Sequence, residues 1–346
     1  MKHGHQTIVE VQYLRAIAVL LVFLGHAHQN EGRFFSDTAF GDYMYFGFAG
    51  VDVFFVISGF IIHTLYRDHS GVDPVFYLHR LNRIFPMYWV FTLGAMLGYW
   101  LVLGRSLGPV MAETDWVRTL TLWPGNEAPL LPVAWTLTHE LYFYLTYAVF
   151  LAFPVRWRVH MASAWLLITL IGLVIPDRNE HPLFQLMISP FNLLFLAGVA
   201  LAEWRKRFER FGVLAVVTTV SGLILGLIYT GSTGLPGLEN VGVRVAVFAP
   251  FAVGLCWCFL ALKPKLPSIL VAIGDWSYAL YLGHTLVLDV LARLLVPRID
   301  GALLDSLIFY PLGFILVLIM SAIAHHGFER PALAVGKSII KRFHSH

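Results

Sequence analysis

The sequence places two ionisable side chains inside its first long apolar segment. Arg15 and His26 stand eleven residues apart within VQYLRAIAVLLVFLGHAHQN (residues 11–30). Eleven steps along a helix return a side chain to within about 20° of its first direction, after a rise of about 16 Å. Both groups therefore share one face, and since lipid contact costs either of them at least about 2.5 kcal/mol, we expect this face to line a protein cavity. Alternatively, Arg15 extends to the headgroups and His26 caps a neighbouring helix.

Two carboxylates stand in similarly apolar surroundings. Asp52 occurs in GVDVFFVISGFII, followed by Ser58. A nearby imidazole would gain basicity and a fixed tautomer from this carboxylate, although Asp52 could instead simply cap a helix. Glu140 occurs in WTLTHELYFY, a segment that begins at Trp135. An ionisable group at membrane depth is a functional candidate by default.

Two arginines in YLHRLNRIFPMYW form a third candidate group. Arg80 and Arg83 are three residues apart, so they share one helix face. Two guanidiniums on one face can bind a phosphate group through paired hydrogen bonds. The alternative is an ordinary basic flank that contacts lipid phosphate.

A later segment, GDWSYALYLGHTLVLDV, places Tyr281 and His284 along one side of a helix, either as a cavity wall or as core residues. The two cysteines, Cys256 and Cys258, point to different sides of a helix, so we expect neither a disulfide nor a metal site.

The elements that must position these residues are membrane-spanning helices. Of the 346 residues, 58% are hydrophobic and 13% are charged, whereas soluble domains are nearer half apolar and a quarter charged. The apolar residues come in blocks of about 18–25, the length of a transmembrane helix. We predict an all-α, polytopic membrane protein with about ten spans around a polar central cavity. The predicted spans are 11–29, 43–66, 84–104, 131–153, 160–176, 183–202, 212–230, 241–262, 270–296 and 303–327.

The distribution of basic residues predicts the orientation of these spans. Seventeen of the 24 Lys and Arg residues fall in the segments that share a side with the N-terminus. Because basic residues are enriched on the cytoplasmic side, we expect both termini to be cytoplasmic. We read residues 1–346 as a single domain, with the motifs between about 11 and 331.

Taken together, these motifs resemble the acyltransferase-3 family of bacterial membrane acyltransferases, which modify surface and exported glycans. The resemblance rests on five motifs in order: Arg15-x10-His26, GVDVFFVISGF, Arg80-x2-Arg83, WTLTHELYFY and SYALYLGHTLVL. It implies a protein of the bacterial inner membrane that transfers an acyl group, commonly acetyl, from cytoplasmic acyl-CoA to a sugar hydroxyl. Some members carry an additional SGNH-type domain, which we do not expect here because the sequence ends at His346.

The resemblance also implies roles for the candidate residues. His26 would be the catalytic histidine, acting as base or transient acyl carrier, and Arg15 its partner along the donor path. Arg80 and Arg83 would contact the phosphates of CoA. By position alone, the remaining candidates would orient or bind the acceptor or stabilise the oxyanion: Asp52, Ser58, Trp135, Glu140, Tyr281 and His284.

The expected partners are acyl-CoA, a glycan or lipid-linked sugar, membrane lipid and, in addition, glycan-assembly proteins or further copies of the chain. We expect no nucleic acid and no metal. The competing hypothesis is a secondary transporter in which Arg15, His26, Asp52 and Glu140 form an ion relay. Such transporters often show repeated halves, and the sequence shows no such symmetry.

Overall fold

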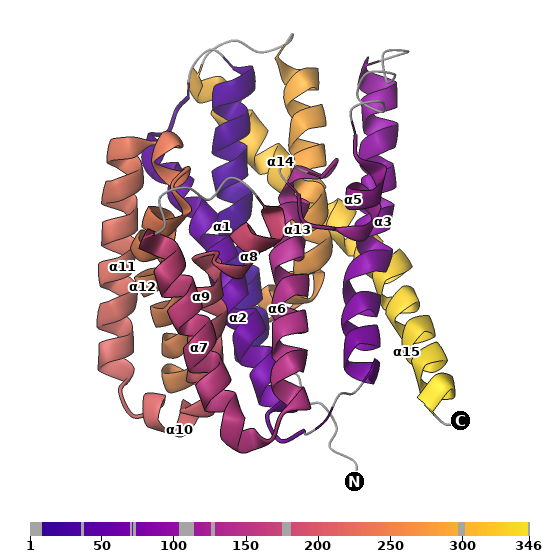
Figure 1. Cartoon of the computed structure of the whole chain (residues 1–346). Coiled ribbons are helices and arrows are strands. Elements are labelled where there is room, and N and C mark those ends of the chain that lie inside the picture. Colours follow the sequence, from indigo (N-terminus) through magenta and orange to yellow (C-terminus); the bar gives the residue numbers. More distant parts are fainter. Residues whose placement is uncertain are drawn as a thin grey trace.

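The computed structural model describes residues 9–344 except 36–37, 70, 72–73, 104–113, 126–128, 175–180 and 297–301. Long helices lie side by side in this part of the chain, which contains no β-strand (Figure 1). The α-helices are α1 (Val9–Phe34), α2 (Ala49–Tyr66), α3 (Pro74–Leu103), α5 (Trp116–Thr121), α6 (Trp135–Ala152), α7 (Val155–Val174), α8 (Pro182–Met187), α9 (Phe191–Glu203), α10 (Arg205–Phe208), α11 (Gly212–Thr233), α12 (Val241–Leu262), α13 (Ser268–Leu295), α14 (Ala302–Ala324) and α15 (Arg330–His344). Short 3₁₀ segments are η1 (Asp42–Phe48), η3 (Pro132–Ala134) and η4 (Pro236–Leu238), and η5 (His325–Glu329) is a π-helix.

Eight helical segments in the described part of the chain are long and apolar enough to cross a bilayer. They include α1, α2, α7, α8 with α9, α11, α12, α13 and α14. The predicted spans 84–104 and 131–153 correspond to α3 and α6, which are helical but fall outside these eight. Both helices contribute polar side chains to a shared cavity. The all-helical prediction is confirmed, and the count of ten spans stays a prediction.

Two predicted spans differ from simple helices. The span 183–202 is divided into α8 and α9, because Pro190 stands at the junction and lacks an N–H group for a helical bond. At the other end of the chain, α14 does not end near residue 327. It continues through the π-helix η5 into α15.

Glycines allow the helices that carry the candidate residues to approach closely. A Cβ atom at Gly59 of α2 would lie 2.1 Å from the backbone oxygen of Phe195, and one at Gly198 of α9 would lie 2.1 Å from that of Val56. A Cβ at Gly50 would lie equally close to the oxygen of Ala18 in α1. Small residues at helix contacts are typical of membrane helix bundles, where close van der Waals packing, rather than the hydrophobic effect, drives helix association. The glycine in the VISGF motif therefore holds α2 against α9.

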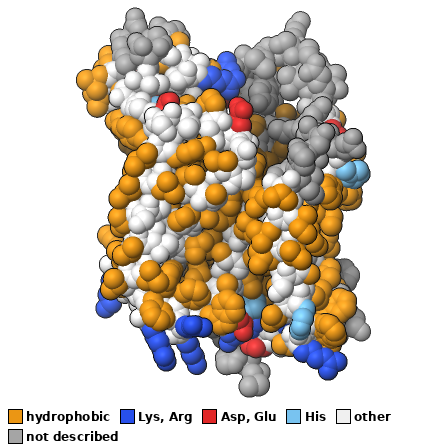
Figure 2. Space-filling model, turned by 60° about the vertical axis from the view of Figure 1, so that its left-hand side comes forward, with side chains coloured by type: hydrophobic (Ala, Val, Ile, Leu, Met, Phe, Trp, Pro, Cys, Tyr) orange, Lys and Arg blue, Asp and Glu red, His pale blue; other side chains and the backbone are white. Residues whose placement is uncertain are grey.

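Lys and Arg residues are concentrated at one end of the bundle (Figure 2). The space-filling view shows an apolar band along the helices, with most of the visible Lys and Arg side chains below it (Figure 2). The first turn of α1, the short helix α10 and the last turn of α15 lie at this end (Figure 1). We call it the basic end; α10 contributes Arg205, Lys206 and Arg207 to it.

Candidate active site

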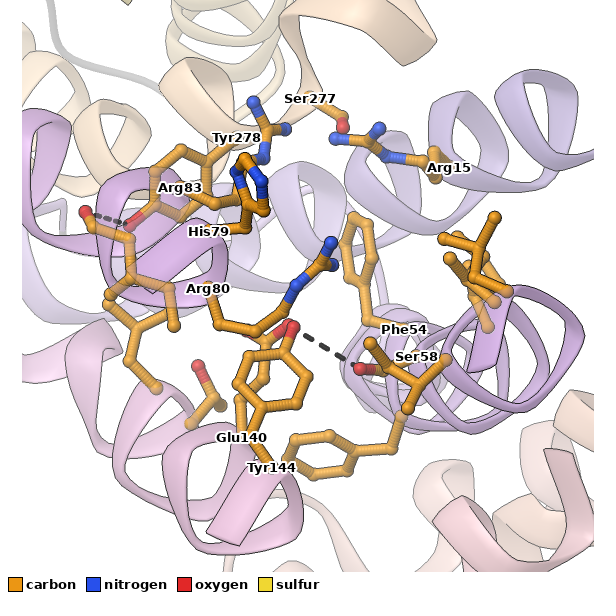
Figure 3. Close-up of a pocket in the computed structure, with 18 of the residues that line it drawn as sticks. Arg15, Phe54, Ser58, His79, Arg80, Arg83, Glu140, Tyr144, Ser277 and Tyr278 are labelled. Atoms are coloured by element: carbon orange, nitrogen blue, oxygen red, sulfur yellow. Dashed lines mark hydrogen bonds between the residues drawn. The ribbon is translucent and has the colours of Figure 1, made fainter. Parts of the chain in front are cut away.

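A cavity of about 590 Å³ lies between α1, α2, α3, α6 and α13, with α15 at its margin. Its lining along α2 runs from Val51 to Tyr66, a distance of about 22 Å at the rise of an α-helix. The polar and charged groups in this wall come from segments far apart in sequence: Arg15, Ser58, Tyr66, His69, His79, Arg80, Asn82, Arg83, Thr136, Glu140, Tyr144, Ser277, Tyr278, Tyr281 and Lys337. We call this space the cationic cavity, because Arg15, Arg80 and Arg83 converge on it (Figure 3).

The two arginines of the Arg-x2-Arg motif have different surroundings. Arg83 donates to Glu329, a carboxylate that is 2% exposed and also lies 2.8 Å from Nδ1 of His325. The guanidinium of Arg80 instead lies over the rings of Tyr66 and Tyr144, at 5.9 and 5.8 Å. Its Nε is buried and has no hydrogen-bond partner among the described residues. Arg83 is thus neutralised by a protein carboxylate, whereas Arg80 keeps its charge available to the cavity.

Glu140 lies within the cavity wall, where two hydroxyl groups contact it. Ser58 of α2 donates to its Oε1 at 3.4 Å, and the hydroxyl of Tyr144, one turn further along α6, donates to the same oxygen. Figure 3 shows all three side chains on the side of the cavity that Arg80 faces. Ser58 and Glu140, which the sequence offers as separate candidates, are therefore brought together in space, with Tyr144 added by the structure.

His26 has a second histidine as its neighbour. Its ring contacts the ring of His284 edge-on, with the ring centres 4.7 Å apart, and the ring of Phe48 at 4.8 Å. Nδ1 of His26 lies 3.0 Å from the carbonyl oxygen of Val22, and Nδ1 of His284 lies 2.8 Å from that of Tyr281. A carbonyl can only accept, so each Nδ1 carries the proton and each Nε2 of the neutral rings has a free lone pair. We call these two residues the imidazole pair.

The imidazole pair lies beside the cationic cavity and not within its lining. Arg15 lines the cavity, but neither His26 nor His284 does. The expectation that Arg15 and His26 line one cavity is therefore met only by Arg15 for this cavity. Tyr281 connects the two regions. It lines the cavity, its ring lies 6.0 Å from that of His284 and 5.8 Å from that of Phe54, and Thr136 Oγ1 lies 2.9 Å from its hydroxyl.

Asp52 is paired with an arginine, where the sequence suggested an imidazole. Its Oδ2 accepts from Arg244 of α12 at 3.1 Å, and the carboxylate is fully buried. Arg244 also donates to the carbonyl of Phe48 at 3.2 Å and lies over the rings of Trp135 and Phe191, at 5.8 and 5.2 Å. Asp52 and the predicted Trp135 are thus held by one guanidinium, next to the Phe48 that contacts His26.

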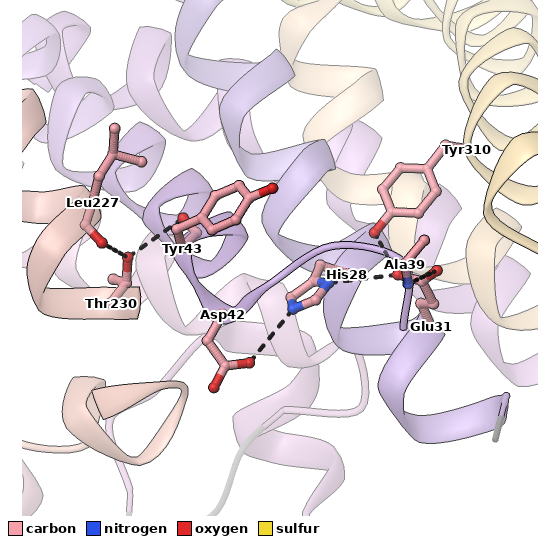
Figure 4. Close-up of polar contacts among 8 residues, drawn as sticks. All are labelled: His28, Glu31, Ala39, Asp42, Tyr43, Leu227, Thr230 and Tyr310. Atoms are coloured by element: carbon pink, nitrogen blue, oxygen red, sulfur yellow. Dashed lines mark hydrogen bonds and ion pairs between the residues drawn. The ribbon is translucent and has the colours of Figure 1, made fainter. Parts of the chain in front are cut away.

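Beyond the imidazole pair, a polar cluster occupies the end of α1 opposite the basic end. His28 lies 3.5 Å from Glu31 and 3.8 Å from Asp42, and Tyr310 donates to Glu31 at 2.8 Å (Figure 4). Tyr45 links this cluster to the site, since its ring contacts His28 at 4.7 Å and stacks on Phe48 at 6.1 Å.

Sequence reasoning missed three functional candidates. Glu329 reads as a helix terminus in the sequence, yet the π-helix, a local widening that is frequent at functional sites, turns it toward Arg83. Arg244 reads as one basic residue at the outer end of the predicted span 241–262, although its position at the start of an apolar span is the signal that could have marked it. Lys337 lies at the margin of the cavity only because α15 continues beyond the last predicted span.

Comparisons with known proteins identify the family of the chain. Residues 8–326 match the acyltransferase domain family. The chain belongs to the acyltransferase-3 family. It is 34% identical over 281 residues to the exopolysaccharide production protein ExoZ of Rhizobium meliloti, covering 78% of this chain and 83% of that protein.

More distant relatives of this acyltransferase are the acyltransferase MdmB of Streptomyces mycarofaciens and nodulation protein 10 of Rhizobium leguminosarum. They are 27% and 26% identical, with 82% and 83% of this chain and 79% and 84% of the relatives covered. No solved structure matches the chain. The family membership and the multi-pass helices make this a membrane acyltransferase, and they do not favour the transporter hypothesis.

Proposed function

We propose that this acyltransferase moves an acyl group, most simply acetyl, from acyl-CoA to a hydroxyl group of an exported or cell-surface glycan or of its lipid-linked precursor. The similarity to an exopolysaccharide production protein supports a glycan as acceptor. The observation that carries the proposal is the cationic cavity, which combines an unpaired Arg80 with Arg15 and Lys337 beside an imidazole pair.

The donor would enter from the basic end, which we propose faces the cytoplasm. CoA is strongly anionic, and Arg80, Arg15 and Lys337 supply cations along the cavity wall. Arginine forks bind phosphate oxygens through paired hydrogen bonds. With the phosphates near Arg80, the pantetheine arm extends along α1, where Arg15 and His26 are separated by about 16 Å of helix.

The acceptor would approach from the opposite end, past the cluster shown in Figure 4. Asp42 and Tyr43 are exposed there, and the rings of Tyr45 and Phe48 continue inward to His26. Carboxylates bind sugar hydroxyls and aromatic faces bind the apolar faces of sugars, so this surface suits a glycan.

In the transfer step, Nε2 of His26 accepts the proton of the acceptor hydroxyl while that oxygen attacks the thioester carbonyl. The C–S bond then breaks, and the thiolate leaves with the proton from His26. In the alternative order Nε2 itself attacks the thioester, the C–S bond breaks, and the CoA thiolate leaves behind an acyl-imidazole. The sugar hydroxyl then attacks the acyl carbon, the C–N bond breaks, and the freed Nε2 takes the hydroxyl proton and passes it to the thiolate. In both orders Tyr281 would have to move, because it lines the cavity and its ring contacts that of His284.

The experiment is to delete the gene in its host and complement the strain with wild type or with Arg80→Ala. Mass spectrometry of the surface glycans then reports the acyl group, and calorimetry with purified protein reports CoA binding. We expect wild type to restore one acyl mass per modified sugar and to bind CoA, and Arg80→Ala to weaken that binding about 10-fold or more. Glycans that are identical in the deleted and complemented strains would overturn the proposal.

A further inference from the structure

A second cavity, of about 300 Å³, lies at the basic end on the far side of the bundle from the cationic cavity. Its lining comes from the end of α9, from α10 and from the beginning of α11, with one residue of α12. The lining residues are Trp204, Arg207, Phe208, Phe211, Leu214 and Trp257. None of them lines the cationic cavity, so this second cavity has no part in the proposed acyl transfer.

The charges around this cavity leave one guanidinium available to a ligand. Glu209 pairs with Arg205 at 3.0 Å and with Lys263 at 3.4 Å, so these three charges largely satisfy one another. The exposed Arg207 forms no ion pair within the described residues. Because Arg207 also lines the cavity, the site combines aromatic walls with a cation that the protein itself does not neutralise.

The position of the cavity is that of a lipid headgroup. Leu214 begins the apolar side of α11, and it is 52% exposed. Trp204 is similarly exposed, and the indole of Trp257 donates to the carbonyl of Phe208 at 2.7 Å. Tryptophan is enriched at the membrane interface, where its ring is at headgroup depth. In Figure 2 the apolar band meets the basic residues at this same end.

We propose that this cavity binds one anionic glycerophospholipid. The headgroup phosphate would contact the guanidinium of Arg207, and an acyl chain would lie along Phe211 and Leu214 toward the bilayer. The choice of an anionic lipid follows from charge: basic pockets between helices on the side with most Lys and Arg bind anionic headgroups, and the phosphate would neutralise the unpaired Arg207.

Native mass spectrometry of the purified protein with phosphatidylglycerol or phosphatidylcholine at equal mole fractions tests this directly. We expect wild type to retain one phosphatidylglycerol at least 5-fold more tightly than phosphatidylcholine. Arg207→Glu should abolish that preference. The matched control is Arg210→Glu, which makes the same charge change at an exposed residue that does not line the cavity, and it should keep most of the preference.

Four results would overturn the proposal. Equal retention of the two lipids by wild type would show that the cavity does not select for an anionic headgroup. Equal loss of the preference in the Arg207 and Arg210 variants would show that general surface charge, and not this cavity, causes it. If Arg207→Glu changed the oligomeric state instead of lipid retention, the cavity would be a contact between copies of the chain. Glycerol phosphate, which lacks acyl chains, should not compete at the same concentration, and full competition would exclude a lipid site. Gel filtration of each variant confirms that it is folded.

Discussion

The cationic cavity and the imidazole pair are adjacent but physically different. The cavity wall gathers charged groups that stay partly exposed, and one of them, Arg80, forms no ion pair among the described residues and has a buried Nε without a hydrogen-bond partner. The histidines have no charged hydrogen-bond partner, and each ring is anchored to a backbone carbonyl through Nδ1. A charged, open region suits binding of a polyanion, and a neutral, water-poor region suits proton transfer and a reactive thioester. This difference predicts that substitutions in the two regions will change different kinetic constants.

The largest effect is expected for His26→Ala in the imidazole pair. Loss of a general base or of a nucleophile costs about 10²–10⁴-fold in rate, and this substitution removes either role. Binding of CoA should be nearly unchanged, because His26 does not line the cavity. Glycan acylation in cells, measured by mass spectrometry, and calorimetric CoA binding separate the two effects.

The matched control is His160→Ala, which removes an exposed histidine from α7. It should acylate glycans like wild type. Near-normal acylation by the His26 variant would contradict the mechanism while leaving the family membership intact.

The second prediction concerns the Asp52–Arg244 pair, which supports the imidazole pair through Phe48. Arg244→Met leaves the buried carboxylate of Asp52 unpaired, which typically costs about 3–5 kcal/mol. Asp52→Asn combined with Arg244→Met should recover much of this loss, since no uncompensated charge remains. Thermal denaturation in detergent measures both. If the double variant were less stable than Arg244→Met alone, the pair would not be the reason for the loss.

The third prediction separates the two arginines of the Arg-x2-Arg motif. Arg80→Ala should raise the KM for acyl-CoA about 10–100-fold, since hydrogen bonds to charged groups contribute about 1.5–3 kcal/mol. Arg83→Ala should chiefly lower the Tm, because it leaves the buried Glu329 with His325 as its remaining described partner.

Arg83→Ala with Glu329→Gln provides the control, and its Tm should lie closer to that of wild type. Equal increases in KM for both single variants, without a change in Tm, would show that both arginines bind the donor.

The sequence predicts the helices and several residues of the cavity wall but not the pairing of charges. Spacing along one helix places Arg80 beside Arg83, and apolar length predicts the spans, because both depend on local geometry. The partner of Asp52 is 192 residues away and that of Arg83 is 246 residues away. Such contacts depend on which helices become neighbours, and α-helical periodicity carries no information about that. The continuation of α14 into α15 was also missed, since a π-helix has no clear sequence signal.

The smallest predicted effect tests the boundary between the two regions. Tyr281→Phe keeps the ring against His284 and Phe54 but removes the hydroxyl that contacts Thr136 and the carbonyl of Val133. If Tyr281 must move for the thioester to reach His26, the variant ring is held by fewer hydrogen bonds than the wild-type ring. Losing about 1 kcal/mol of this stabilisation would favour the displaced position of the ring by about 5-fold. We expect kcat to rise or stay constant while the KM for acyl-CoA is unchanged. A fall in kcat as large as that of His26→Ala would instead make the hydroxyl a participant in the chemistry, and the boundary would then belong to the reacting site.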